Sequence, residues 1–159
     1  MKIKIIAVGR LKEDFYKKAA AEYEKRLSRF HKITVLELGE ELKSDSPGES
    51  EIKKALNKEG EKIQKAVSPG ALVIALAIEG EALSSEELAE KIKKTADSGT
   101  GEIVFIIGGS HGLCPEVLKR ADFLLSFSKM TFTYQLSRVI LTEQLYRASK
   151  INSGEVYHK

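Results

Sequence analysis

Short apolar runs alternate with amphipathic stretches along the whole chain. The runs are rich in Ile, Val, Leu and Phe, and two of them, ALVIALAI and EIVFII, have no polar face. This composition is typical of strands that are covered on both sides. The pattern predicts five strands, at residues 2–8, 33–38, 71–78, 102–107 and 121–127.

Between these runs, apolar residues recur at intervals of three and four, which predicts amphipathic helices. Ser84 and Glu87 have the spacing of a capping box at the start of one helix. Gly60 interrupts another, so we expect that helix to be loose or bent at its middle. The predicted helices lie at 15–30, 52–67, 88–96 and 135–149, with a further helix beginning near Pro115.

The alternation of strands and helices predicts an α/β fold. We expect a Rossmann-like parallel sheet with helices on both faces. The segment GEELKSDSPGESE, at 39–51, is the one stretch with the composition of a flexible loop. With 159 residues and no internal repeat or linker, the chain is predicted to form a single domain over residues 1–159.

Cysteine content and hydropathy exclude several classes of protein. Cys114 is the only cysteine, so no internal disulfide can form, and no Cys/His cluster has zinc-ligand spacing. No apolar run approaches the roughly 18 residues of a membrane span. We therefore expect a cytoplasmic protein with no metal site and no membrane association, in which Cys114 is a packing residue.

The net charge of +3 is concentrated near the C-terminus. From Lys129 onward there are five basic and two acidic residues, so this last fifth of the chain holds the whole excess. A basic end on a balanced body is what a nucleic-acid phosphate footprint looks like, and a solvated charged helix looks the same.

Three consecutive strands are followed by small, polar or glycine-rich segments, and in open α/β sheets ligands collect at these positions. The segments are IEGEALSSEE, GGSHGLCPE and SKMTFTYQLSR. Gly108, Gly109 and Gly112 suit a cofactor loop and equally a tight strand-to-helix turn. Their spacing is neither GxGxxG nor that of a P-loop, which disfavours conventional dinucleotide or triphosphate binding.

Two histidines carry little functional signal. His111 follows Ser110 directly, but no GxSxG elbow is present and no acid is placed to orient the imidazole, so nucleophilic hydrolysis is disfavoured. His31 follows the first predicted helix, and we expect it to cap that helix or to be solvated at its end.

The stretch SFSKMTFTYQLSRVILTEQLYRASK is the most specific in the chain. Met130 and Phe132 suit an apolar wall for a ring and equally a place in the core. Arg138 and Arg147 are nine residues apart on a predicted helix, so they point to different sides, and one of them could serve another subunit.

Together, IIGGSHGL, LSFSKMTF, QLSRVILTEQLYRA and the terminal YHK resemble the small SPOUT-class methyltransferases. More narrowly, they resemble the enzymes that methylate N3 of a pseudouridine in the large-subunit (23S) ribosomal RNA of bacteria. The resemblance runs from MKIKIIAVG to YHK and so covers essentially the whole chain. It implies a C-terminal deep trefoil knot, S-adenosylmethionine as cofactor, and a homodimer acting on the ribosome.

The resemblance also assigns roles by position. Cofactor contacts are expected at Leu76, Gly108, Phe127, Ser128, Lys129, Met130, Thr131 and Phe132. The chemistry of the implied reaction makes His158 and Arg138 the candidate catalytic residues: a cation, Arg138, His158 or Lys159, could stabilise the anion at N3, and neutral His158 could accept its proton. RNA contacts are expected at Arg138, Arg147, Tyr157, His158 and Lys159.

Two positions depart from the family pattern. Histidine is common in the family where this chain has Tyr134, and proline commonly precedes the final Tyr-His-Lys where this chain has Val156. The first departure bears on any proton-transfer role at that position, and the second on the rigidity of the tail.

Two other functions fit parts of the pattern. A non-catalytic RNA-binding or ribosome-associated module would account for the basic end, and a nucleotide-binding regulatory protein would account for the strand exits. Neither accounts for both. We therefore expect the C-terminal tail, GEVYHK at residues 154–159, to close over substrate at the site of a partner chain.

Overall fold

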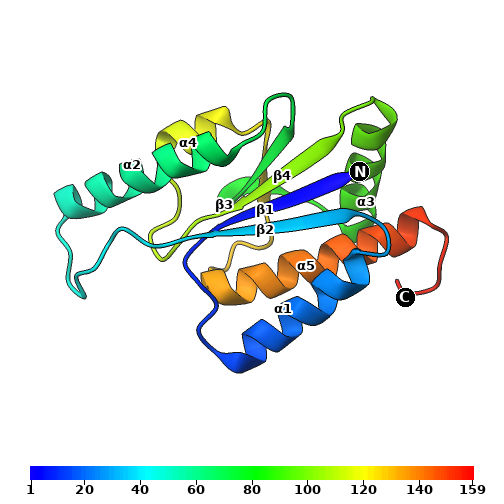
Figure 1. Ribbon diagram of the computed structural model, residues 1–159, viewed down its shortest axis with the longest axis horizontal. Coiled ribbons are helices and arrows are strands. Elements are labelled where there is room, and N and C mark those ends of the chain that lie inside the picture. Colours follow the sequence, from blue (N-terminus) through cyan, green and yellow to red (C-terminus); the bar gives the residue numbers. More distant parts are fainter.

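The computed structural model describes all residues from 1 to 159, and the fold is built on one parallel sheet of five strands in the order β2-β1-β4-β3-β5 (Figure 1). All neighbouring strands run parallel. The strands are β1 (Lys2–Val8), β2 (Lys32–Leu38), β3 (Leu72–Ala82), β4 (Glu102–Ile107) and β5 (Phe123–Ser126).

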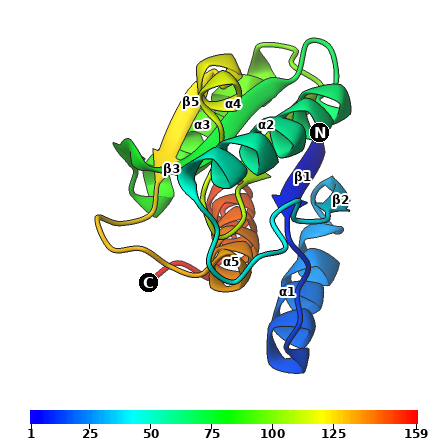
Figure 2. The same cartoon turned by 90° about the vertical axis from the view of Figure 1, so that its left-hand side faces the viewer.

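Helices cover both faces of the sheet (Figures 1 and 2). α1, α3 and α5 pack on one face, and α2 and α4 pack on the other. The helices are α1 (Asp14–Leu27), α2 (Glu49–Ala66), α3 (Ser85–Asp97), α4 (Pro115–Arg120) and α5 (Tyr134–Asn152). The predicted α/β class with helices on both faces is therefore confirmed.

Strand β1 contributes to two separate hydrophobic cores, one on each face of the sheet. Ile3 and Ile5 point into the core beneath α1, α3 and α5, whereas Ile6 and Val8 point into the core beneath α2 and α4. All four side chains are fully buried. Side chains alternate along a strand, so the consecutive apolar residues 5–8 place apolar groups on both faces of the sheet. Both faces must therefore be covered.

Most predicted elements are found within a few residues of their expected bounds. The predicted strands at 2–8 and 102–107 match β1 and β4. Ser84 and Glu87 form the predicted capping box of α3, with the Ser84 hydroxyl accepting from the Glu87 N–H at 3.1 Å. The segment at 39–48 is a loop without helix or strand.

Two local expectations change. Helix α2 is continuous through Gly60. The side chain of Cys114 occupies the space that a Cβ at this position would need. The glycine therefore permits a close contact rather than a bend. His31 is half-buried, not solvated, and lies 3.1 Å from the Ser149 hydroxyl. Burial lowers the pKa of His31, with the N-terminal ammonium adding to this effect.

Strand β3 extends beyond the predicted run and bends over β5. It pairs with β5 on both sides of an irregularity between Leu76 and Glu81. A Cβ on Gly80 would lie 2.6 Å from the Leu124 carbonyl oxygen, so only glycine allows the crossing. The trefoil knot that the resemblance implies stays a prediction. None of the helices combines the length and apolar character needed to cross a membrane.

Candidate functional site

A cleft of about 880 Å³ lies at the carboxyl ends of the strands. The segments after β1, β2, β4 and β5 and the middle of β3 contribute to its wall, because in a parallel sheet the carboxyl ends meet at one edge. Lys12 follows β1, Glu40 follows β2, Leu76 belongs to β3, Ser110 follows β4 and Phe127 follows β5. Residues at the start of α5, between Tyr134 and Ser137, complete the wall. Figure 2 shows that α5 begins directly after the loop that follows β5.

The loop after β5 is shaped by its own serines. The Ser126 hydroxyl donates to the Ser128 carbonyl at 3.1 Å, and the Met130 N–H donates to the Ser128 hydroxyl at 3.0 Å. These contacts turn the chain so that Met130 is 73% exposed while Phe127 stays half-buried. The loop therefore offers an apolar wall that a ligand could cover.

The glycine loop after β4 is tightly folded. A Cβ on Gly108 would lie 2.5 Å from the Gly112 carbonyl oxygen, and Gly112 itself has φ +77°. Both positions therefore require glycine. The Glu40 carboxylate accepts from the Ser110 N–H at 3.0 Å and from its hydroxyl at 2.8 Å, which ties this loop to the segment after β2.

The first turn of α5 is fixed against the exit of β1. Thr133 caps the helix by accepting from the Leu136 N–H at 3.3 Å. The Lys12 N–H donates to the Gln135 side chain at 2.6 Å. The Tyr134 ring packs on Gly9, where a Cβ would lie 2.7 Å from the ring and where φ is +89°.

Six of the eight residues predicted to hold the cofactor line this cleft: Leu76, Phe127, Ser128, Met130, Thr131 and Phe132. Gly108 lies just behind the lining and shapes it through its contact with Gly112. Lys129 is in the same loop, but its side chain is not part of the wall.

The residues present fit S-adenosylmethionine. The cleft volume is in the range of cofactor sites, and its wall combines apolar side chains with a few polar groups, as such sites do. Leu76, Phe127 and Phe132 could hold the adenosine part. No group of three or more His, Cys, Asp or Glu side chains is placed to hold a metal ion.

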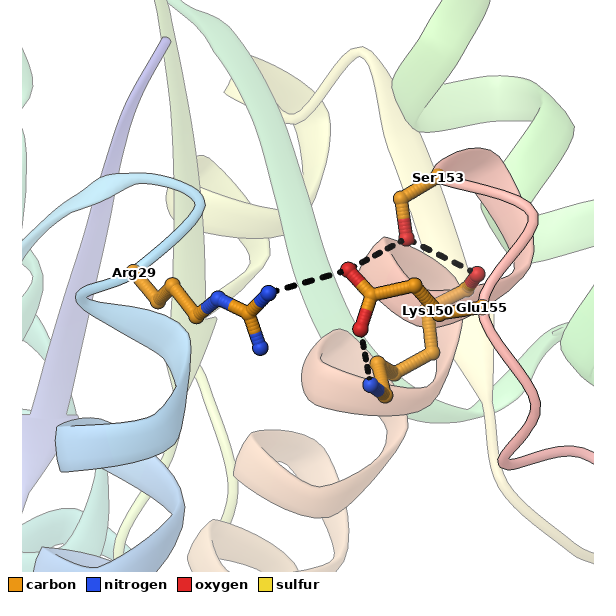
Figure 3. Close-up of polar contacts among 4 residues, drawn as sticks. All are labelled: Arg29, Lys150, Ser153 and Glu155. Atoms are coloured by element: carbon orange, nitrogen blue, oxygen red, sulfur yellow. Dashed lines mark hydrogen bonds and ion pairs between the residues drawn. The ribbon is translucent and has the colours of Figure 1, made fainter.

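The C-terminal tail is bound to its own chain. Glu155 forms ion pairs with Lys150 and, at 3.4 Å, with Arg29 at the end of α1, and the Ser153 hydroxyl also donates to it (Figure 3). These contacts lower the pKa of Glu155, the hydrogen bond from Lys150 most of all. They turn the chain back along α5.

Tyr157 lies in a cluster on α5. Its ring meets that of Tyr146 edge to face at 4.8 Å, and its hydroxyl donates to the Glu143 carboxylate at 3.2 Å. The Arg147 guanidinium lies 4.8 Å from the ring centroid and pairs with Glu143 at 2.6 Å. Burial, with Tyr23 and Glu143 nearby, raises the pKa of Tyr157 to about 12, so the phenol stays neutral.

Both ring nitrogens of His158 have partners. Arg147 can only donate, so Nδ1 accepts from it at 3.3 Å, and Nε2–H then donates to the Glu86 carboxylate at 2.6 Å. Lys159, the last residue, is exposed. The structure thus brings Arg147, Tyr157 and His158 together, and their contact with RNA stays a prediction.

Arg138 is separate from this group. Its side chain is 8% exposed and lies between α1 and β2, where it pairs with Glu37 at 2.5 Å and with Glu24 at 3.5 Å. It is not part of the cleft wall. The expectation that Arg138 and Arg147 point to different sides is confirmed.

The tail does not reach the cleft of its own chain. Ser137 is the last cleft-lining residue on α5, and Arg147, which meets His158, lies ten residues further on. At 1.5 Å per residue this is about 15 Å along the helix. The candidate cofactor and tail residues therefore form two groups in a single chain.

Sequence reasoning missed Lys12 and Glu40 as parts of the cleft wall. Their position in the sequence could have indicated this role, because each follows a predicted strand, as the glycine loop does. The strand order was the missing information, since it places the exit of β1 beside that of β4 and the exit of β2 beside that of β1.

Together, the parallel sheet and the cleft at its carboxyl edge define an α/β ligand-binding protein. A family model described as "Predicted SPOUT methyltransferase" matches residues 1–158. The chain belongs to this methyltransferase family. Membership in an enzyme family decides against the non-catalytic module and the regulatory protein.

Relatives support the same family. Ribosomal RNA large subunit methyltransferase H from Bifidobacterium adolescentis is 54% identical over 159 residues, which is 100% of each chain. Two solved structures share the fold. A probable methylase family protein from Haemophilus influenzae has TM-score 0.55 and 17% identity, covering 99% of this chain and 70% of that one. A probable methyltransferase from Bordetella pertussis has TM-score 0.59 and 14% identity, covering 93% and 96%.

Proposed function

We propose that this protein transfers a methyl group from S-adenosylmethionine to N3 of a pseudouridine in large-subunit (23S) ribosomal RNA. A full-length relative at 54% identity carries the name of a ribosomal RNA large subunit methyltransferase, which supports the RNA substrate. The observation that carries the proposal is the cleft, whose wall holds six of the eight expected cofactor contacts.

The cofactor supplies a methyl group made electrophilic by its sulfonium charge. The task left to the protein is to align the acceptor nitrogen with that methyl group at near-attack distance. The half-buried wall formed by Leu76 and Phe127 holds the adenosine part and keeps water from it. The glycine loop, fixed through Ser110 and Glu40, sets the width of the cleft.

We further propose a homodimer in which the tail of each chain serves the cleft of the other. The tail residues stop about 15 Å short of the cleft-lining part of α5 in their own chain. Phe15 on α1 is 63% exposed and Val156 in the tail is 85% exposed, so apolar surface is available for a partner.

His158 is the proposed proton acceptor for N3, with Arg147 beside it to stabilise the developing anion. In the docked tail both imidazole nitrogens are engaged, by Arg147 and Glu86. The Nδ1 lone pair must therefore be released from Arg147 before it can accept a proton. Release of the docked tail is a required step in this proposal.

RNA contacts are proposed at Arg147, Tyr157, His158 and Lys159. The pseudouridine must be in a single-stranded or flipped-out state to enter the cleft. Arg138 has a different part, because its guanidinium is held by Glu24 and Glu37. We infer that it positions the first turn of α5 beside the cleft rather than touching RNA.

The test of function is mass mapping of 23S ribosomal RNA from cells that lack this protein. We expect one pseudouridine to lose a methyl group and to regain it when the gene is restored. Purified protein should then methylate ribosomal particles far faster than naked RNA, because a net charge of only +3 gives weak binding to RNA alone. Equal rates on both substrates would contradict the ribosomal part of the proposal.

A further inference from the structure

The cleft wall contains one carboxylate and one lysine, and neither has a place in the proposed reaction so far. Glu40 and Lys12 are the only Asp, Glu, Lys or Arg side chains among its 20 lining residues. His111 is the one histidine in the wall. The cleft wall therefore contains one negative and one positive side chain, and a ligand with both charges could pair with them.

The strand order places this pair at one end of the cleft. Glu40 and Lys12 follow β2 and β1, which are neighbours, whereas the apolar wall comes from β3 and β5. Strand β4 lies between the two groups. With strands about 4.8 Å apart, β1 and β3 are separated by about 10 Å. The cleft therefore has an apolar end and a charged end.

Local packing shows that the position of Glu40 is built into the fold. A Cβ on Gly109 would lie 2.7 Å from Glu40 Oε1, so the glycine makes room for this carboxylate. Oε1 accepts both hydrogen bonds from Ser110, and Oε2 has no partner within the chain. The Lys12 ammonium likewise forms no ion pair within the chain, although its backbone N–H is held by Gln135. Both charges are free for a ligand.

S-adenosylmethionine has the matching polarity. Its adenosine end is apolar and aromatic, and its other end is an α-amino acid with one ammonium and one carboxylate. We propose that Glu40 binds the α-ammonium and Lys12 the α-carboxylate, with the adenosine on the side of Leu76 and Phe127. The proposal rests on the proposed cofactor and adds an orientation to it.

An RNA phosphate is the main competing ligand for Lys12. Glu40 would repel a phosphate bound there, since the two side chains line the same cleft. A zwitterion satisfies both charges at once. The observations therefore favour the amino-acid end of the cofactor.

The test compares two ligands by calorimetry on the full chain. 5′-Methylthioadenosine contains the adenosine and sulfur of the cofactor but lacks its amino-acid group. We expect Lys12→Met and Glu40→Gln each to weaken S-adenosylmethionine binding by about tenfold, because each removes one charge-assisted contact. Binding of methylthioadenosine should stay unchanged in both variants.

The controls distinguish loss of a ligand contact from a change in folding or in the position of the glycine loop. Gln at position 40 retains an oxygen that can accept from Ser110, so the glycine loop stays in place. Lys43→Met and Asp45→Asn alter the adjoining loop without altering the cleft wall, and both should bind like the parent protein.

Four outcomes would overturn the inference. Equal weakening of both ligands would mean that the pair only shapes the cleft. Unchanged cofactor binding with slower RNA methylation would assign the pair to RNA. A parent protein that binds methylthioadenosine and S-adenosylmethionine equally well would show that the amino-acid end is not recognised, whereas a parent that binds neither would remove the proposed cofactor as well.

Discussion

The two halves of helix α5 serve the protein in different ways. Its first turn, with Tyr134 and Gln135, is fixed by a hydroxyl cap, by the backbone of the β1 exit and by packing on Gly9. Its C-terminal half carries the tail, which is held by contacts between largely exposed side chains such as Arg29 and Glu155. The first arrangement depends on backbone shape, and the second on surface charge.

This difference indicates which part of the site is preformed and which part can move. Close contacts of Gly9 with the Tyr134 ring, and of Gly80 and Gly108 with neighbouring backbone, fix the segments around the cleft. Ion pairs between exposed side chains, such as Arg29 and Glu155, stabilise weakly, so the packing of Tyr157 on Tyr146 is the main contact that release of the tail must break. A preformed cofactor site and a releasable tail suit an enzyme that must admit a large substrate.

The largest expected effect comes from removing the tail. Truncation after Glu155 removes Val156 to Lys159, and we expect methylation to fall by at least about 100-fold because the proposed proton acceptor is lost. Cofactor affinity should stay within about twofold, since no removed residue lines the cleft. Single-turnover methylation and calorimetry measure the two effects. Retention of most activity would show that the tail has no part in the reaction.

Mixing variants sharpens this test. At a cofactor concentration below saturation, a truncated chain and a Gly108→Ala chain should each have at most about a tenth of the parental activity alone. If the tail of one chain serves the cleft of the other, refolding the two together should restore up to about a quarter of the parental activity, because a mixed dimer then has one complete site. Failure of all mixtures would contradict the shared site.

At the cleft end, Gly108→Ala should weaken cofactor binding by about tenfold and lower the free energy of unfolding by about 1–3 kcal/mol. The added Cβ would lie 2.5 Å from the Gly112 carbonyl oxygen and must displace the glycine loop. Gly101→Ala is the matched control, because a Cβ there meets no atom within 4 Å. Calorimetry and urea unfolding give both quantities, and equal behaviour of the two variants would contradict the structure of the loop.

The two arginines of α5 test the comparison through stability. Arg138→Met should lower the free energy of unfolding by about 2–4 kcal/mol, because it leaves Glu37 and Glu24 without their buried partner. Arg147→Met should cost less than about 1 kcal/mol, since its contacts are to the tail and to Glu143 on the same helix. Methylation should show the reverse order once the folded fraction is accounted for, and urea titration of both variants provides that fraction.

Acid should loosen the tail before it affects the cleft. The pKa of Glu155 is below its ordinary value of 4.5 in the folded chain, so its contribution is present above about pH 4.5 and is lost as pH falls through the lower folded pKa. The Tyr157 ring signals in NMR should then change in acid while those of Phe127 do not. Glu155→Gln should remove the pH dependence of the tail. Parallel changes at Tyr157 and Phe127 would mean that the whole chain responds as one unit.

Local sequence signals predicted most of the elements and part of the site. The capping box of α3, the largely buried strands β1 and β4 and the FSKMTF loop follow from short-range patterns, because each depends on residues close together in the chain. The prediction that α2 is loose or bent at Gly60 was wrong because the role of this glycine depends on a distant residue. Its role depends on Cys114, which lies far along the chain and meets it only when α2 and α4 pack on the same face.

The sequence by itself determined the α/β alternation, the glycine and FSKMTF segments as candidate ligand loops, and the family resemblance of the terminal YHK, because these are properties of residue order. Only the tertiary structure decided that Lys12 and Glu40 share a cleft with Leu76 and that Arg138 lies buried between two carboxylates. Strand order and helix packing bring these groups together, and both result from contacts between residues far apart in the chain.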